Sequence, residues 1–268
     1  MLLRSVFLKG LRDLRRSFPF WAIGAAIMPI TLGLLYPSIK RASVDVQRYI
    51  EAMPEAFVTM FVGAARDFTS PVGYMDAELF SFMAPIVFIA FGISLGVRQI
   101  AGEEEQGTLS LLLSYPRPRT RLLLEKAAVL IVGLILLTLA QLVAMVVGVR
   151  IGGAGLGFGT IFEGHVMLFL LALSVSAIAF AAGAATGNRG VAIGVGASFA
   201  LGSYLLNALA PLNATIAPLR KASLFSYYGG TQPLRSGVDA GSAAVLLVVT
   251  AAAFAVALVA FARRDLHT

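Results

Sequence analysis

Three consecutive carboxylates, Glu103, Glu104 and Glu105, lie between two strongly apolar stretches of the chain and precede Gly107 and Thr108. Carboxylates in the last turn of a helix are disfavoured by about 0.3–1 kcal/mol each when exposed, because that end of the helix is itself negative. Residues that break a local rule in this way often serve a function. Their ion-pairing chemistry suits a contact with a soluble partner. The alternative is a solvated turn whose acids pair with nearby basic residues: Arg117, Arg119 or Arg121.

Local signals around the glutamates predict one helix that stops and a second helix that starts. Gly107 supplies the left-handed conformation at which helices commonly end, and Thr108 is a good N-cap for a new helix. A leucine-rich body follows, and Pro116 and Pro118 end it. The segment 99–122 is therefore predicted to hold a short helix that lies across the membrane surface.

Enzymatic and metal chemistry find little support in the residue pattern. The chain has no cysteine, which excludes a thiolate metal site and a cysteine nucleophile, and it lacks the H-E-x-x-H pattern of zinc proteases. We therefore predict no catalytic residue and no metal site. His165 beside Glu163 would suit a proton relay, but their place at the edge of an apolar stretch favours a solvated interface. Ser198 lies in an incomplete nucleophile motif, which leaves an intramembrane enzyme as a weak alternative.

The elements that must position these residues are membrane helices. Of the 268 residues, 58% are hydrophobic and 13% are charged, whereas soluble domains carry about 25% charged residues. A membrane helix needs about 20 predominantly apolar residues, and six stretches meet that length. We expect an all-α, polytopic bundle in a single domain, 1–268, with spans at about 20–38, 79–98, 125–148, 165–187, 190–211 and 242–262.

The basic residues predict how the chain sits in the membrane. Residues 1–19 are amphipathic, with apolar side chains at helical spacing among basic ones, and we expect an interfacial helix there. With both termini in the cytoplasm, 13 of the 21 lysines and arginines fall on inner segments, as the positive-inside rule requires. We expect a multi-pass protein of the plasma (inner) membrane. The net charge of +7 then favours anionic lipid over nucleic acid.

Polar groups in the fifth span form a second candidate site. Ser203 and Asn207 are four residues apart and share one helix face. Together with Ser198 and Tyr204 they are candidates for lining a translocation path. The alternative is that they only bond neighbouring helices.

The glutamate segment also carries a family resemblance. The string E-x-E-x-G-T-L-x-x-L-L-S-x-P-x-x-R, from Glu103 to Arg119, followed by Lys126, resembles the cytoplasmic loop of type 2 ABC exporter permeases. The stretches SPVGYMDAELFSFMAP (70–85), SLFSYYGGTQPLRSG (223–237) and FARRDL (261–266) resemble further landmarks of that family, in family order.

The resemblance implies a six-span permease that pairs with a second copy or a paralogue and exports a hydrophobic or amphipathic substrate. Two separate ATPase subunits would dock from the cytoplasm and hold ATP and Mg, and this chain would bind no cofactor. The helix after the glutamates would act as a coupling helix, with Glu103, Glu104, Glu105, Gly107, Thr108, Arg117 and Arg119 as the candidate coupling residues.

The residue pattern is consistent with a permease whose ATP is bound by separate subunits. The chain has no G-x-x-x-x-G-K-[ST] motif, so it is not expected to be an ATPase itself. A secondary transporter is the main alternative, although the predicted spans lack the mid-membrane carboxylates that ion coupling uses. An intramembrane enzyme or a passive assembly or immunity-type membrane protein also stays open.

Overall fold

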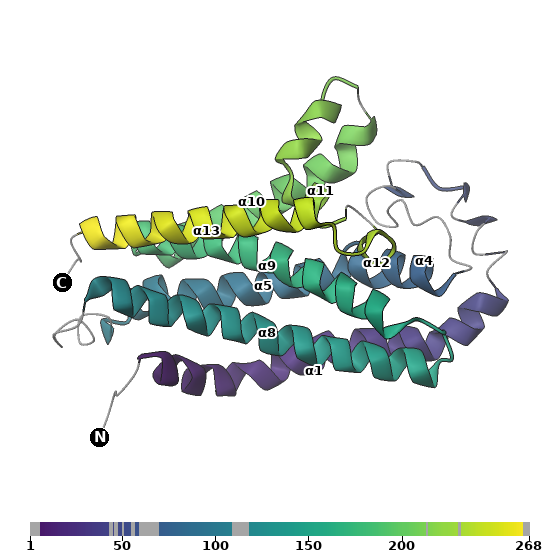
Figure 1. The fold of residues 1–268 in the computed structure, drawn as a ribbon, viewed down its shortest axis with the longest axis horizontal. Coiled ribbons are helices and arrows are strands. Elements are labelled where there is room, and N and C mark those ends of the chain that lie inside the picture. The colour runs from purple at the N-terminus through teal and green to yellow at the C-terminus, as the bar shows by residue number, and fades with distance from the viewer. Residues whose placement is uncertain are drawn as a thin grey trace.

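The computed structural model describes residues 6–42, 45, 48–49, 51–54, 57–58, 70–108, 118–212, 214–229 and 232–264. Within these residues all regular secondary structure is helical, which confirms the all-α prediction (Figure 1). The long helices run roughly parallel to one long axis of the molecule. They are α1 (Val6–Arg41), α5 (Met83–Val97), α8 (Arg119–Ile151), α9 (Phe158–Thr186), α10 (Arg189–Leu209) and α13 (Ala240–Arg263).

Six helical stretches of the described chain are long and apolar enough to cross a membrane, and each coincides with one predicted span to within a residue at its ends or extends beyond it. The second of them, Pro71–Glu105, is built from five consecutive pieces. These are α4 (Pro71–Met75), the π-helix η2 (Asp76–Phe80), α5, the π-helix η3 (Arg98–Gly102) and α6 (Glu103–Glu105). π-helical turns are rare and often mark functional sites, and here η3 leads directly into the glutamate run.

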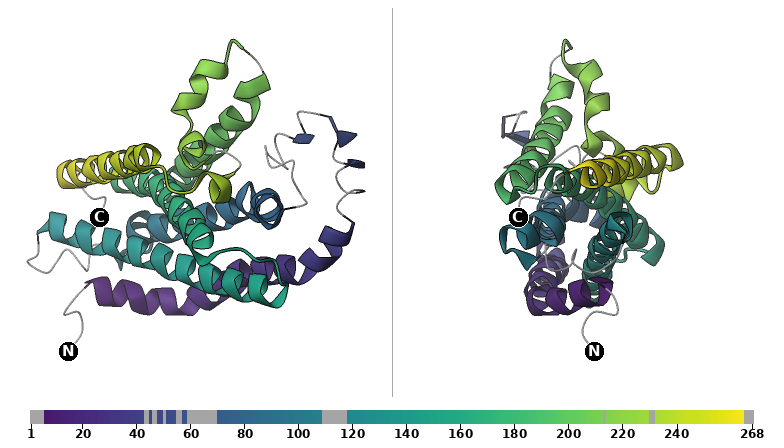
Figure 2. Two further views of the ribbon diagram at one scale, coloured as in Figure 1. Left: turned by 45° about the vertical axis from the view of Figure 1, so that its right-hand side comes forward. Right: turned by 90° about the vertical axis from the view of Figure 1, so that its left-hand side faces the viewer.

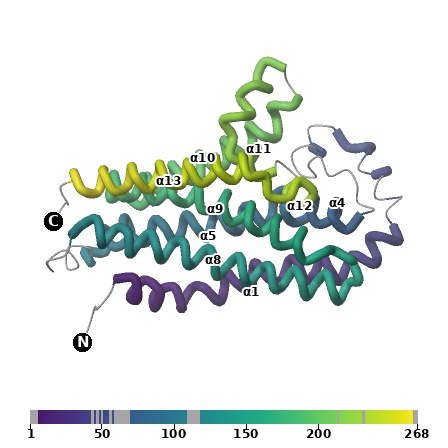
Figure 3. Tube along the Cα trace, in the orientation of Figure 1, coloured from purple at the N-terminus to yellow at the C-terminus, as the bar shows by residue number. Residues whose placement is uncertain are grey.

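The N-terminal segment differs from its prediction as a separate interfacial helix. α1 runs without interruption from Val6 to Arg41, so residues 6–19 continue into the first span (Figure 3). Pro19, Pro29 and Pro37 lie inside this helix. Each removes one backbone hydrogen bond, but packing against α8 supports the helix along its length. The amphipathic pattern is explained in part by burial, because Val6 and Leu14 lie in the protein core.

The centre of the bundle is α9, which packs against α5, α8, α10 and α13. Its span is the most enclosed of the six, and 78% of the residues in an 18-residue apolar stretch of it are buried. α1 and α13 are far more open, and large apolar side chains cover their outer faces. In a membrane protein such faces meet lipid, so α9 holds the bundle together while α1 and α13 form its periphery.

α1 and α8 approach each other most closely at three glycines. A Cβ atom added at Gly33 would overlap the backbone of Gly148, and one added at Gly152 would overlap the backbone of Gly33. Small residues at helix crossings let backbones come this close and compensate for the absence of a hydrophobic effect within lipid.

The two ends of the bundle differ in character. α1 begins and α13 ends at one end, where α6 and the start of α8 also lie; we call this the termini end (Figures 1 and 3). The opposite end carries the short helices α11 (Leu224–Tyr227) and α12 (Pro233–Ser236). There the end of α10, with η4 (Ala210–Leu212) and η5 (Ala217–Ala222), stands out from the bundle (Figure 2).

Candidate functional site at the termini end

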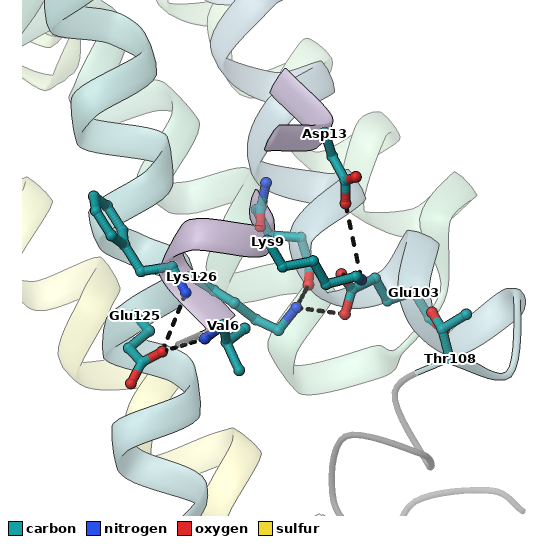
Figure 4. A network of polar contacts seen from close by, with 9 residues as sticks. Val6, Lys9, Asp13, Glu103, Thr108, Glu125 and Lys126 are labelled. Carbon is teal, nitrogen blue, oxygen red and sulfur yellow. Dashed lines mark hydrogen bonds and ion pairs between the residues drawn. The ribbon is translucent and has the colours of Figure 1, made fainter. Parts of the chain in front are cut away.

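Glu103 joins three parts of the bundle through one carboxylate. Its Oε1 accepts a hydrogen bond from Lys9 Nζ of α1 at 2.7 Å, and its Oε2 accepts one from Lys126 Nζ of α8 at 2.6 Å. Lys126 also donates to the carbonyl oxygen of Gln99 in η3. Figure 4 shows this network together with Asp13, Thr108 and Glu125. The second span is thereby fastened to the first and the third.

Lys126 is fully enclosed, with 0% of its side chain exposed. Taking an ammonium out of water costs several kcal/mol, and good geometry with several partners is needed to compensate for it. Glu103 and the Gln99 carbonyl supply those partners. The pair therefore fixes α6 and α8 in one relative position, because separation would leave a buried charge without a counter-ion.

Glu104 connects the end of α13 to the same cluster. Its Oε2 accepts a charge-assisted hydrogen bond from Arg264 Nη2, while Arg119 Nη1 at the start of α8 donates to the Arg264 carbonyl at 2.7 Å. The left-handed residue Gly187, which caps α9, lies against both side chains, since an added Cβ would stand 2.6 Å from Glu104 Oε2.

Glu105 completes the set by accepting a hydrogen bond from the backbone N–H of Arg189 at 3.1 Å, at the first residue of α10. Glu103, Glu104 and Glu105 together thus contact the termini-end segments of the five other long helices, or the caps of those helices. We call these three residues the glutamate knot. Its members lie next to one another in sequence but reach different elements.

The solvated-turn alternative does not describe Glu103 and Glu104, whereas Glu105 is exposed. Arg121 pairs with Glu125 at 3.2 Å, and Arg119 binds a backbone carbonyl rather than a carboxylate. The side chains of Glu103 and Glu104 are each only 12% exposed. Arg117 lies outside the described residues. The knot is therefore a structural junction, whatever further contacts it makes.

Gly107 and Thr108 form the bend directly after the knot. Gly107 has φ +68°, the left-handed conformation predicted for it, and its N–H donates to the Glu104 carbonyl at 2.9 Å. Thr108 Oγ1 donates to the Glu103 carbonyl at 3.0 Å, so its side chain binds the end of the preceding helix. The predicted short helix over 109–117 lies outside the described residues.

Sequence reasoning did not identify Lys126 as a partner of the knot, nor Glu125 as an acceptor at the start of α1. Glu125 and Lys126 follow three leucines at the start of an apolar stretch, and a charged pair in that place is the signal that could have found them. Glu125 accepts hydrogen bonds from the Val6 N–H at 2.7 Å and the Phe7 N–H at 3.1 Å. It thus satisfies the first backbone donors of α1, which a helix start leaves unpaired.

The four predicted path residues lie in different surroundings. Ser198 is exposed on α10. Ser203 accepts a hydrogen bond from the Leu224 N–H at 2.8 Å, and Asn207 accepts one from Arg220 Nε at 3.2 Å. These two residues therefore dock the segment after α10. Tyr204 lines an apolar cavity of about 320 Å³ between α5 and α10.

The burial of His165 contradicts the prediction that this residue lies at a solvated interface. It is fully buried, its Nδ1 lies 2.7 Å from the Ile161 carbonyl oxygen, and its ring meets Phe80 edge to face. The helices cover it because α9 occupies the centre of the bundle, so even residues near its start are enclosed. Its Nε2 has no hydrogen-bond partner among the described residues.

Asp76, in η2, is a second buried acid that sequence reasoning did not single out. Its carboxylate accepts hydrogen bonds from the backbone N–H of Leu234 at 2.9 Å and of Arg235 at 3.3 Å, in the first turn of α12. Tyr228 donates to the Phe80 carbonyl at 3.0 Å nearby. Burial raises the pKa of Tyr228 well above its usual value, so it stays a donor. Asp76 thus anchors the segment before α13 to the second span.

A sequence model for the family described as "ABC-2 family transporter protein" matches residues 4–266. The match takes in the six long helices and the glutamate knot. Comparison with curated proteins finds no match.

Proposed function

The chain belongs to the ABC-2 family of transporter proteins, and from that premise we propose that it is the permease of an ATP-driven exporter for hydrophobic or amphipathic molecules. Family membership and the six apolar helices make it an integral membrane subunit of an ABC transporter, whose ATPase lies in separate subunits. We further propose the direction of transport, the class of molecule transported and the roles of individual residues.

The observation that carries the proposal is the glutamate knot. Three adjacent carboxylates contact all the other long helices or their caps, directly before the bend at Gly107. A partner that shifts residues 109–117 would move this junction and, with it, several helix ends at once. In this mechanism the ATPase supplies two states that differ in their contacts with the segment, and that difference drives the change in the permease.

The coupling residues then divide into two groups. Glu103, Glu104 and Arg119 transmit movement within the bundle, because their hydrogen bonds connect the end of the second span with α1, α8 and the end of α13. Gly107 and Thr108 form the bend, and Arg117 with the helix over 109–117 would meet the ATPase. Two ATPase subunits, each with ATP and Mg, would act on a pair of permeases made of two copies or of this chain and a paralogue.

The cavity between α5 and α10 supports an apolar or amphipathic cargo. Its lining is almost entirely apolar, with Phe82, Ile89 and Ile93 on one side and Tyr204 on the other. Small binding sites of this kind combine an apolar wall with few polar groups. Tyr204 packs against Phe82 and Phe225 at ring-centroid distances of 5.5 Å and 5.3 Å, so its ring forms part of the wall.

The basic residues support an orientation with both termini in the cytoplasm of a cell bounded by its plasma membrane. α1 carries Lys9, Arg12, Arg15 and Arg16 near its start, and α13 ends with Arg263 and Arg264. Positive charge beside membrane spans is typical of the cytoplasmic side. The termini end would then be the side on which ATPases dock.

The experiment that tests the proposal is purification of the full chain with an ABC ATPase from the same membranes, followed by reconstitution in vesicles. Wild type is compared with a variant in which Glu103, Glu104 and Glu105 are all alanine, and with Glu163→Ala, an exposed acid at the opposite end. We expect vanadate-sensitive hydrolysis and ATP-dependent movement of an amphipathic dye, lost or uncoupled only in the triple variant. Full coupling in the triple variant would refute the role of the knot.

A further inference from the structure

A polar cavity of about 310 Å³ lies at the termini end, between α1 and the η3–α6 segment. Three residues of α1 at helical spacing form one wall and three residues of the second span form the other: Lys9, Asp13, Arg16, Arg98, Gln99 and Glu103. Part of the wall, from Asp13 through Lys9 and Glu103 to Thr108, is visible in Figure 4. Glu103 of the glutamate knot thus forms part of the cavity wall.

The charges around this cavity do not balance. Lys9 pairs with Glu103 at 2.7 Å and with Asp13 at 3.9 Å, and Lys126 pairs with Glu103 at 2.6 Å. Two ammonium groups are therefore matched by two carboxylates. Arg16 and Arg98 make no hydrogen bond or ion pair with any part of the chain that the structure describes. Within the described residues, two guanidinium groups therefore face the cavity without a counter-charge.

The apolar residues next to the two arginines indicate the depth of the cavity in the membrane. Arg16 stands one turn before Phe20, which is 79% exposed and begins the outward apolar face of α1 that continues through Ile23 and Ile27. Arg98 likewise follows directly after the apolar helix α5. The cavity therefore lies where the apolar surface gives way to charge, which is the level of lipid headgroups.

We propose that this cavity binds the phosphate headgroup of an anionic phospholipid from the leaflet at the termini end. Guanidinium groups match phosphate oxygens with two parallel N–H donors each, which makes arginine the preferred residue for this contact. Basic pockets between membrane helices at this level hold anionic headgroups in other membrane proteins. The site requires neither a bound ATPase nor transport, so its test is independent of the exporter proposal.

The test is native mass spectrometry of the purified full chain with added phosphatidylglycerol. Arg16→Gln with Arg98→Gln should lower the population with one bound lipid by at least about tenfold, because the loss of even one charge-assisted contact has an effect of that size. The matched control is Arg12→Gln with Arg15→Gln, which removes two exposed charges from the same turns of α1 outside this cavity. The control should retain the lipid. Arg16→Gln alone, on an exposed side chain, repeats the test with little risk to folding.

Three outcomes would overturn the proposal. Equal loss in both double variants would show general attraction to a basic surface. Inorganic phosphate that displaces the lipid at equal concentration would identify a free anion as the natural occupant. Failure of wild type to retain phosphatidylglycerol in preference to phosphatidylcholine would show that the two arginines are occupied by another part of the chain or by a protein partner.

Discussion

Lys126 lies entirely inside the protein and donates a hydrogen bond of 2.6 Å to Glu103, which a second lysine, Lys9, approaches from the other side at 2.7 Å. One carboxylate thus holds the starts of two long helices against the end of a third. The next two residues of the chain extend the same junction to α10 and α13.

Replacement of Glu103 by alanine should strongly destabilise the protein. The change leaves Lys126 buried without a counter-ion, which costs about 3–5 kcal/mol. Unfolding in mixed detergent micelles measures the loss. Asp45→Ala removes an exposed ion pair with Arg48 and should change stability by only about 0–1 kcal/mol.

A double variant separates the ionic contribution from packing. Glu103→Leu combined with Lys126→Met removes both charges, so it should be more stable than Glu103→Ala, as found for other buried ion pairs. If the double variant is the less stable of the two, the cost lies in packing and not in the unpaired ammonium.

Gly148→Ala should weaken the contact between α1 and α8. The new Cβ would overlap the backbone at Pro29, and overpacking of this kind costs about 1–3 kcal/mol. Gly24→Ala is the matched control on α1, because nothing lies within 4 Å of its added Cβ; it should be neutral or stabilising by about 0.5–1 kcal/mol. Thermal unfolding of the two purified variants gives the comparison. Equal melting temperatures would contradict the close approach.

The fold was largely predictable because length and hydropathy alone identify membrane helices. All six spans are recovered, and the helices extend beyond the predicted ends because charged residues such as Arg189 and Arg119 continue the helical turns. The continuity of residues 6–19 with the first span was not predicted, since a local pattern does not reveal whether Pro19 interrupts a helix that neighbouring α8 supports.

The site was predictable in part. The glutamates were singled out because carboxylates are disfavoured in the last turn of a helix. Gly107 was predicted to end that helix, and its φ of +68° confirms the left-handed conformation. Their partners could not be inferred from spacing, because Lys9 lies 94 residues from Glu103 and Arg264 lies 160 residues from Glu104. Only the packing of all the helices brings those charges together.

Asp76→Ala should release α12 from the second span. Two backbone N–H groups lose their acceptor, at a cost of about 1–3 kcal/mol. The chain contains no cysteine, so a single Leu234→Cys substitution reports exposure of this buried position. Its labelling by a maleimide should accelerate about tenfold in the Asp76→Ala background, since tenfold corresponds to about 1.4 kcal/mol.

Two controls make the Asp76 result specific. Asp76→Asn keeps one carbonyl oxygen as an acceptor and should accelerate labelling less. Val238→Cys, on an already exposed side chain, should react at the same rate in every background. Unchanged labelling of Leu234→Cys in Asp76→Ala would show that other contacts hold α12.

Gly107→Val should uncouple ATP hydrolysis from transport if the bend transmits movement from residues 109–117 to the knot. A β-branched residue is strained at φ +68°, so the bend would open and the segment would change its direction. Gly153→Val is the matched control. Gly153 has φ +62°, and like Gly107 it has nothing within 4 Å of an added Cβ.

The comparison uses both variants reconstituted with the ATPase partner, and the quantity measured is dye moved per ATP hydrolysed. Both variants should lose similar stability, because the backbone strain is the same in each. Only Gly107→Val should lower the ratio, since Gly153 lies between α8 and α9, far in sequence from the knot. An equal fall in both variants would attribute the effect to stability, and an unchanged ratio in Gly107→Val would mean that the force from the ATPase enters the permease elsewhere.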